Sequence, residues 1–244
     1  MARSLVNRLL GVIPAADRGG QIGGAPPPLL QTGEGTFLER AITVLRSAGV
    51  ERVFVGVRDA RDPVAAQALR AGAEIVEVGG EGRDPSASLE AVEGKTTSAS
   101  DRGSARLGGS AAAGGSAAAG GSALSGSEQE NVSFLLLPST YPGVSASTVR
   151  AMIEEWRGAG EAAKVAAPLL PEGTSLAHLP WHELAPLILR GPRAADRLRA
   201  PGAVGGADLL RIPVTDPGVG ERIDTLPLYR RHFPQAFRRR FQKW

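Results

Sequence analysis

Several residue types are missing from this chain, and each absence removes a class of structure. The 244 residues include no cysteine, which excludes disulfide bonds and thiolate metal sites. No apolar run approaches the roughly 20 residues that cross a bilayer. The first ten residues also lack the apolar core and cleavage site of a secretory signal. We therefore expect a cytoplasmic protein that has no membrane partner.

Aromatic residues and lysine are rare. Aromatics make up only 5% of the chain, so alanine, valine and leucine must fill most of the core that a 42% hydrophobic composition supports. Lys95, Lys164 and Lys243 are the only lysines among 28 basic residues, and the arginines form dense clusters only in the segment 226–244. A nucleic-acid site needs arginines gathered on one surface. Nucleic acid is therefore not an expected partner.

The segment 226–244 has the pattern of an amphipathic helix that is interrupted near Pro234. Its large apolar residues recur every three or four positions, and the arginines of 230–231 and 238–240 fall between them. We expect the aromatic edge to pack on the protein and the arginines to face solvent.

The order of apolar runs predicts an α/β fold. Segments of strand length alternate with segments of helical periodicity, which favours a mainly parallel sheet with helices on both faces, a three-layer, Rossmann-like architecture. Thr36 and Glu39 form a capping box before one helix, and Asp62 with Pro63 begins another. The expected strands are 12–16, 53–57, 74–78, 132–137, 165–169 and 209–214, and the expected helices between them begin near 37, 63, 86 and 147.

One internal segment has no apolar periodicity. Residues 108–127 are a near-repeat of glycine, serine and alanine, which cannot bury enough surface to offset its ordering entropy. The strands before it are too few to form a stable sheet alone. We therefore expect a single domain spanning 1–244, with a disordered insertion at about 95–130 between the helix 86–93 and the next strand.

The loop after the first strand is rich in glycine. Gly19, Gly20, Gly23 and Gly24 follow Ala15 and Ala16, and Arg18 is the only cation nearby. Successive backbone amides in such a loop can cradle a phosphate. The same glycines also suit a turn that needs positive φ, so both interpretations stay open. Because the spacing is not G-x-G-x-x-G, a dinucleotide-binding oxidoreductase is disfavoured.

In order, these segments resemble the MobA-like NTP transferases, closest to the molybdenum-cofactor cytidylyltransferase branch. That family opens with a strand, a loop A-A-G-x-S-x-R-M-G-x-x-K and a helix L-L-E-R-A. It later carries S-S-L, G-D-x-P and D-I-D-T-P-E-D-Y elements. The matching segments here are Ala15–Gly23, Phe37–Ala41, Ser86–Leu89, Leu137–Pro142, Asp216–Gly218 and Ile223–Thr225, with Tyr229 in step. The likeness covers nearly the whole chain outside the insertion.

The resemblance implies the nucleotide-diphospho-sugar-transferase-like form of this fold and a nucleotidyl transfer. CTP or GTP would give its nucleotidyl group to a small phosphorylated acceptor, such as a molybdopterin-type cofactor, with Mg²⁺ held by carboxylates. Matched by position, the resemblance assigns catalysis to Arg18 and Asp224, Mg²⁺ to Asp224, and nucleotide binding to Ala15, Ala16, Gly19, Gly20, Gly23 and Ser88. Asp224 equally suits a cap on the C-terminal helix beside Thr225.

Departures from the family pattern bear on this chemistry. The loop arginine corresponds to Gln21, the loop lysine falls among Pro26–Pro28, and the aspartate of G-D-x-P aligns with Thr140. Each missing cation removes about a few kcal/mol of transition-state stabilisation, and a neutral hydroxyl is a poor sole ligand for Mg²⁺. Asp17 replaces a glycine and either repels the ligand or serves as a relocated metal ligand. The sequence fits both a divergent transferase with eroded motifs and an inactive nucleotide-binding or regulatory protein of the same fold.

Overall fold

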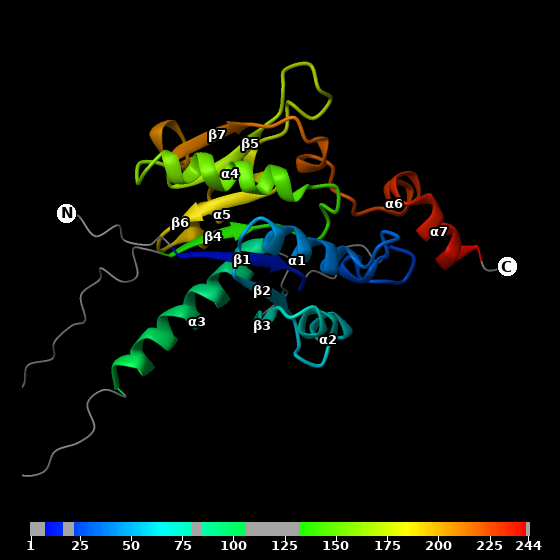
Figure 1. Ribbon diagram of the computed structural model, residues 1–244, viewed down its shortest axis with the longest axis horizontal. Coiled ribbons are helices and arrows are strands. Elements are labelled where there is room, and N and C mark those ends of the chain that lie inside the picture. Colours follow the sequence, from blue (N-terminus) through cyan, green and yellow to red (C-terminus); the bar gives the residue numbers. More distant parts are fainter. Residues whose placement is uncertain (1–7, 17–21, 80–83, 106–131, 243–244) are drawn as a thin grey trace, which may run out of the picture.

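The computed structural model describes residues 8–16, 22–79, 84–105 and 132–242, in which one seven-stranded sheet lies between two layers of helices (Figure 1). The strands stand in the order β3-β2-β1-β4-β6-β5-β7. Their bounds are β1 Arg8–Pro14, β2 Arg52–Val57, β3 Glu74–Glu77, β4 Val132–Leu136, β5 Val165–Leu169, β6 Leu187–Arg190 and β7 Leu209–Pro213. This architecture confirms the three-layer α/β fold expected from the sequence.

The sheet is built outward from β1 in two directions. β1 pairs in parallel with β2 on one side and with β4 on the other, and β2 pairs in parallel with β3. β5 and β7 also pair in parallel, whereas β6 lies antiparallel between β4 and β5. After β3 the chain therefore crosses back over β1 and starts the second half of the sheet at β4.

A different set of helices packs on each face of the sheet. The alternation along β2 sends Val53 and Val55 into the cluster that contains buried residues of α1, α2 and α4. Phe54 points to the opposite cluster, with buried residues of α3 and α5. The helices are α1 Phe37–Ser47, α2 Pro63–Arg70, α3 Pro85–Ala105, α4 Ala146–Gly158, α5 Ala194–Arg199, α6 Leu226–His232 and α7 Pro234–Phe241. Within the described ranges, no helix combines the length and apolar character needed to cross a membrane.

Side-chain caps begin the helices where the sequence places them. The Thr36 hydroxyl accepts a hydrogen bond from the Glu39 amide (3.1 Å), and the Glu39 carboxylate accepts one from the Thr36 amide (2.7 Å), so the capping box of α1 is confirmed. Asp62 caps α2 by accepting from the Val64 amide at 2.9 Å. These caps satisfy amides that would otherwise lack partners at the helix starts.

The helix α3 is longer than the sequence predicts. It continues to Ala105, so the residues from 95 to 105 are helical and do not belong to a disordered insertion. Leu89 and Val92 are fully buried and fix its first turns, and extending an existing helix is far easier than nucleating one. The rest of the expected insertion, including the glycine-, serine- and alanine-rich repeat at 108–127, lies in the segment 106–131, outside the described residues.

The strand β6 has no counterpart among the expected strands. All four of its residues are buried. Its apolar run between Pro186 and Gly191 is too short for periodicity to distinguish a strand from a helix or a loop. In addition, β6 runs antiparallel to β5, and no α-helix separates the two strands. It therefore departs from the alternation of strands and helices that predicts the other strands.

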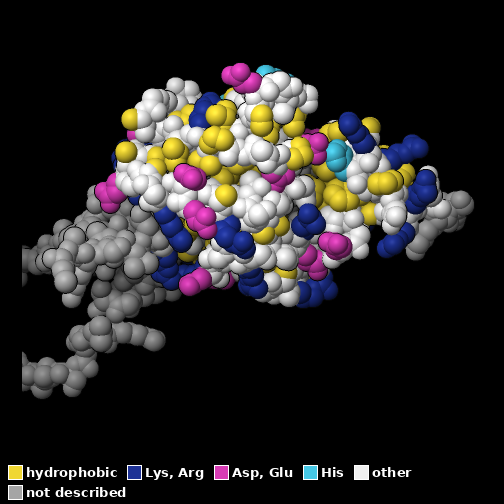
Figure 2. Space-filling model, turned by 45° about the horizontal axis from the view of Figure 1, so that its top comes forward, with side chains coloured by type: hydrophobic (Ala, Val, Ile, Leu, Met, Phe, Trp, Pro, Cys, Tyr) yellow, Lys and Arg dark blue, Asp and Glu magenta, His cyan; other side chains and the backbone are white. Residues whose placement is uncertain are grey.

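The two C-terminal helices form an aromatic cluster against the loop that precedes α1. The expected interruption near Pro234 is confirmed, because α6 ends at His232 and α7 begins at Pro234. Tyr229 is fully buried, and its cluster also includes Phe37, which begins α1. Lys and Arg side chains gather on the outer face of this end of the molecule (Figure 2).

Candidate functional site

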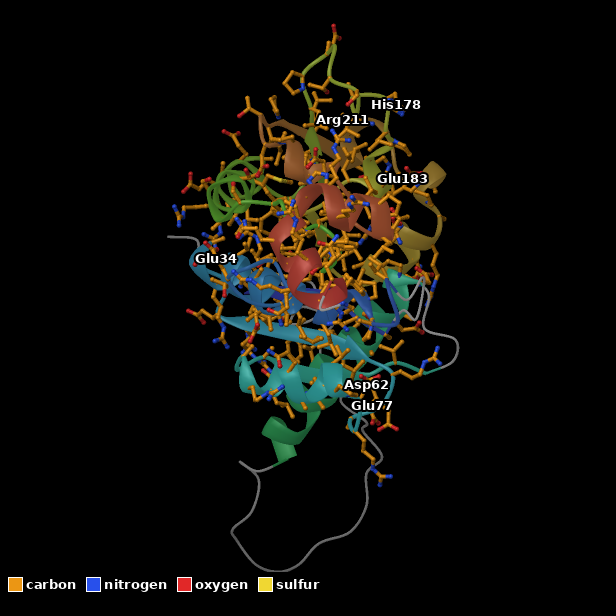
Figure 3. The ribbon with its side chains drawn as sticks, turned by 90° about the vertical axis from the view of Figure 1, so that its right-hand side faces the viewer. Glu34, Asp62, Glu77, His178, Glu183 and Arg211 are labelled. Carbon is orange, nitrogen blue, oxygen red and sulfur yellow. The ribbon has the colours of Figure 1, made fainter. Side chains whose placement is uncertain are left out.

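The carboxyl ends of β1 and β4 mark the point where the strand order reverses. The chain leaves β1 toward β2 and later returns to β4 on the opposite side, and both strands end at the same edge because they are parallel. In open α/β sheets, ligands bind in the crevice outside the strands at such a switch point. Figure 3 faces this edge, and α6 and α7 cross its middle. This edge is therefore the candidate site.

Three of the residues expected to bind nucleotide lie at this edge or next to it. Ala15 and Ala16 follow β1 directly, and the Ala15 amide donates to the Gly56 carbonyl of β2 at 2.9 Å. Ser88 of α3 packs on the same glycine, since a Cβ added at Gly56 would lie 2.1 Å from its Oγ. The fold therefore brings Ala15 and Ser88 to a common neighbour. Their role in binding stays a prediction.

Gly23 stands in an exposed turn next to α7. It has a φ of +60°, in the left-handed region that favours glycine. A Cβ added there would lie 2.3 Å from the Phe241 ring of α7. Glycine suits this position for two reasons: its backbone conformation is left-handed, and a side chain would collide with α7. Arg18, Gly19 and Gly20 lie outside the described residues.

The segment that carries Asp224 lies against the loop that carries Thr140. The Ile223 amide donates to the Thr140 carbonyl at 2.7 Å, so the segment before α6 is fastened to the loop after β4. Asp224 forms an ion pair with Arg222, with 3.2 Å between the carboxylate Oδ2 and the guanidinium Nε. No side-chain hydrogen bond caps α6 at Thr225. Asp224 thus faces an arginine at the switch point, a partner that the sequence analysis did not identify.

Tyr141 fixes the position of the loop after β4. Its hydroxyl donates to the Glu183 carbonyl at 2.6 Å. Burial raises the pKa of Tyr141 to about 12; the charge of Arg222 lowers it, and those of Glu183 and Asp224 raise it. The phenol therefore stays protonated at neutral pH and serves as a hydrogen-bond donor.

Asp216 connects the loop after β7 to the start of α4. Its carboxylate accepts hydrogen bonds from the Ser145 amide (2.9 Å), the Thr148 hydroxyl (2.7 Å) and the Gly218 amide (2.9 Å). Burial alone would raise the pKa of Asp216, but these hydrogen bonds outweigh it and the pKa is lowered. The Asp-Pro-Gly segment is thus a capped turn that also fastens the loop after β7 to the start of α4.

Replacing Asp216 by asparagine is expected to lower the free energy of unfolding by about 1–2 kcal/mol at pH 7, because the amide has no charge and only one of the two acceptor oxygens. A lowered pKa means that the stabilisation is present above the unfolded value of about 3.9 and disappears as pH falls through the folded value. Urea unfolding at pH 7 and in acid measures both effects. The free energy of unfolding of the variant should fall less between pH 7 and acid pH than that of the wild type.

Asp208→Asn provides the control for this measurement. Asp208 is exposed, and its side chain forms no hydrogen bond within the described part of the chain. The substitution should leave stability unchanged at both pH values. Equal losses in the two variants would contradict the role assigned to Asp216.

The described side chains at this edge do not make a complete metal site. Mg²⁺ requires close to six oxygen ligands in octahedral geometry and is usually held by one or two carboxylates with water and substrate. Asp224 is paired with Arg222, and the position matched to the other family carboxylate is Thr140, whose side chain is neutral. Among the described residues there is no group of three His, Cys, Asp or Glu side chains that could hold a metal ion. Because Asp224 is already paired with an arginine and the other matched position is neutral, the described residues do not fit the two-carboxylate Mg²⁺ site that the resemblance implies.

Comparison with known proteins adds a family and a set of related folds. The sequence profile of the MobA-like NTP transferase domain matches residues 11–216. A search of curated protein sequences gave no match.

Among solved structures, Rv0371c from Mycobacterium tuberculosis H37Rv has a TM-score of 0.57 and 17% identity, with 93% of this chain and 98% of that chain covered. Its manganese complex has a TM-score of 0.53 and 16% identity, with 94% and 99% covered.

Two further structures extend the comparison. Mth528, a nucleotidyl transferase from Methanothermobacter thermautotroptrophicus, has a TM-score of 0.55 and 20% identity over 96% of this chain and 99% of that one. The CMP:2-keto-3-deoxy-manno-octonic acid synthetase complexed with CTP has a TM-score of 0.54 and 14% identity, with 95% and 99% covered. At these identities the likeness establishes the fold.

Proposed function

The chain belongs to the MobA-like NTP transferase family, and from this premise we propose that it binds a nucleoside triphosphate, CTP or GTP, at the switch point between β1 and β4. In the proposed reaction, a phosphate oxygen of a small acceptor forms a bond to the α-phosphorus. The bond between the α- and β-phosphates breaks, and pyrophosphate leaves. A molybdopterin-type cofactor is the acceptor class that the resemblance suggests, and the cytoplasm is the proposed compartment.

One observation carries this proposal: the hydrogen bond from the Ile223 amide to the Thr140 carbonyl. It brings together two segments that are 83 positions apart in the chain, at the edge where Ala15 and Ala16 leave β1. The same segments were matched to the family from sequence, so their meeting at the switch point supports the motif assignment. Nucleotide binding at this edge also follows the general rule for open α/β sheets.

A second candidate function is nucleotide binding without turnover. It is favoured by the neutral Thr140 at the position of a family aspartate and by the Arg222 that faces Asp224. Binding and transfer have different requirements, because transfer also needs the charge that develops in the transition state to be stabilised. Both candidates require nucleotide binding at the same edge of the sheet, and they differ in pyrophosphate release.

Thermal unfolding tests nucleotide binding, which both candidate functions require. A ligand at 100 times its Kd adds about 2.7 kcal/mol to the stability of the folded state, which corresponds to a rise in Tm of about 5–10 °C for a chain of this length. CTP or GTP should give such a rise, whereas inorganic phosphate at the same concentration should give much less. No shift with either nucleotide at millimolar concentration would eliminate the proposal.

Pyrophosphate release separates the two candidates once binding is established. With a candidate phosphorylated acceptor, a transferase releases one pyrophosphate for each nucleotide consumed, and the amount scales with protein concentration. A binding protein gives the thermal shift and no release. Asp224→Asn should reduce release more than it reduces the thermal shift if Asp224 acts in the chemical step.

A further inference from the structure

The charges at the switch point are arranged differently from the pattern that the family resemblance implies. The metal site that the resemblance implies has the carboxylate of Asp224 and a second carboxylate at position 140, where the chain has threonine. Asp224 instead meets the guanidinium of Arg222 at 3.2 Å. The positive charge beside Asp224 is therefore that of an arginine side chain, at the place where the family pattern implies a metal ion.

The backbone holds this arginine in place. Ile223, between the two charged residues, is 2% exposed and its amide is bonded to Thr140. Arg222 and Asp224 thus project from an anchored residue at the edge where β4 ends. Their side chains remain 55% and 38% exposed, so a ligand can reach them.

Arginine has the right chemistry for a phosphate group. Its planar guanidinium is always charged and presents several N–H donors in a fork that matches two phosphate oxygens. The Nε atom faces Asp224. Among the described residues, no hydrogen bond or ion pair engages the two terminal nitrogens, so they can still donate to a ligand. A carboxylate on one side of a guanidinium restricts its orientation, and a restricted donor loses less freedom when it binds an anion.

We infer that Arg222, oriented by Asp224, takes the place of a divalent ion in this chain and binds a phosphate group of the nucleotide without metal. The inference rests on the proposed nucleotide binding and specifies how it occurs. Asp224 then acts as a positioning residue and Arg222 as the phosphate-binding residue. Asp17, outside the described residues, is the other carboxylate that the sequence offers as a metal ligand, so the test must measure metal binding directly.

Nucleotide affinity gives the first half of the test. The Kd for CTP is measured by calorimetry in excess EDTA and in excess Mg²⁺, for the wild type, Arg222→Gln and Arg222→Lys. We expect the wild-type Kd to agree within about threefold in the two buffers, Arg222→Gln to weaken binding by about tenfold or more, and Arg222→Lys to fall between. Arg211→Gln is the matched control, because Arg211 (labelled in Figure 3) is exposed on β7, the edge strand of the sheet, which β6 and β5 separate from β4. It should bind as the wild type does.

Metal affinity gives the second half and needs no nucleotide. Electron paramagnetic resonance of Mn²⁺ should show no specific binding by the wild type and a new site in Thr140→Asp, which restores a second carboxylate beside Asp224. Circular dichroism establishes that Thr140→Asp is folded. If it is not, Arg222→Gln, at an exposed position, carries the test alone.

The outcomes separate the two claims. CTP binding that requires Mg²⁺, Mn²⁺ binding by the wild type, or equal effects of Arg222→Gln and Arg211→Gln would each overturn the inference and leave the proposed function standing. Absence of CTP binding in both buffers would overturn the proposed function and, with it, the assigned role of Arg222.

Discussion

Tyr229→Ala is expected to lower the free energy of unfolding by about 3–5 kcal/mol, the range observed when a large buried aromatic is truncated. The ring is 0% exposed and lies 5.9 Å from Phe37 and 5.9 Å from Phe233, measured between ring centroids. Its hydroxyl donates to the Gln31 carbonyl at 2.9 Å. Removing the side chain leaves a cavity in the cluster that joins α6 and α7 to the start of α1. Urea unfolding measures the change.

Tyr229→Phe separates the ring from the hydroxyl. It keeps the packing and loses one hydrogen bond, so it should lower the free energy of unfolding by about 1 kcal/mol. If the two helices detach without global unfolding, Tyr229→Ala will instead be cleaved faster by trypsin in the arginine-rich segment 230–240, and Tyr229→Phe will not. A Tyr229→Ala protein that matches the wild type in both assays would contradict the packing role.

The fold was predictable where local chemistry and apolar periodicity agree. The capping box of Thr36 and Glu39, the Asp62 cap and the interruption at Pro234 each have a physical signature within a few residues, and each is found in the structure. β6 was missed because its direction depends on the two strands it joins. No local pattern carries that information.

The candidate site shows the same division. The order of the family-like segments predicted that the loop after β4 and the segment before α6 belong to one site, and the bond between Ile223 and Thr140 joins them. The Arg222 ion pair and the Asp216 connection were not predicted. Each depends on a side-chain orientation or on contacts between segments about 70 residues apart, which motif matching does not evaluate. Arg18, Gly19 and Gly20 stay predictions.

Two glycines decide how closely the site-bearing loops approach. A Cβ added at Gly218, in the turn Pro217–Val219 after β7, would lie 2.3 Å from the carbonyl carbon of Gly143 and 2.5 Å from its oxygen. Neither glycine has a positive φ, so the requirement is for space and not for conformation. The loop after β4, which contains Gly143, also carries Thr140.

Gly218→Ala is therefore expected to lower the free energy of unfolding by about 2–3 kcal/mol, because backbone atoms must move to accept the methyl group. Gly143→Ala should cost less, since its Cβ would lie 3.0 Å from the Cα of Gly218. Gly202→Ala, where a Cβ meets open space, should have little effect. Urea unfolding of the three variants tests this order.

The same series tests whether the loop contact supports the site. Moving the loop after β4 shifts Thr140 relative to Ile223, so Gly218→Ala should weaken CTP binding even under conditions where the protein is fully folded. Gly202→Ala supplies the control, because it alters the chain at a position remote in sequence from both loops. Unchanged CTP affinity in a folded but destabilised Gly218→Ala protein would show that the glycine contact sustains the fold alone, and that nucleotide binding tolerates a displacement of this loop.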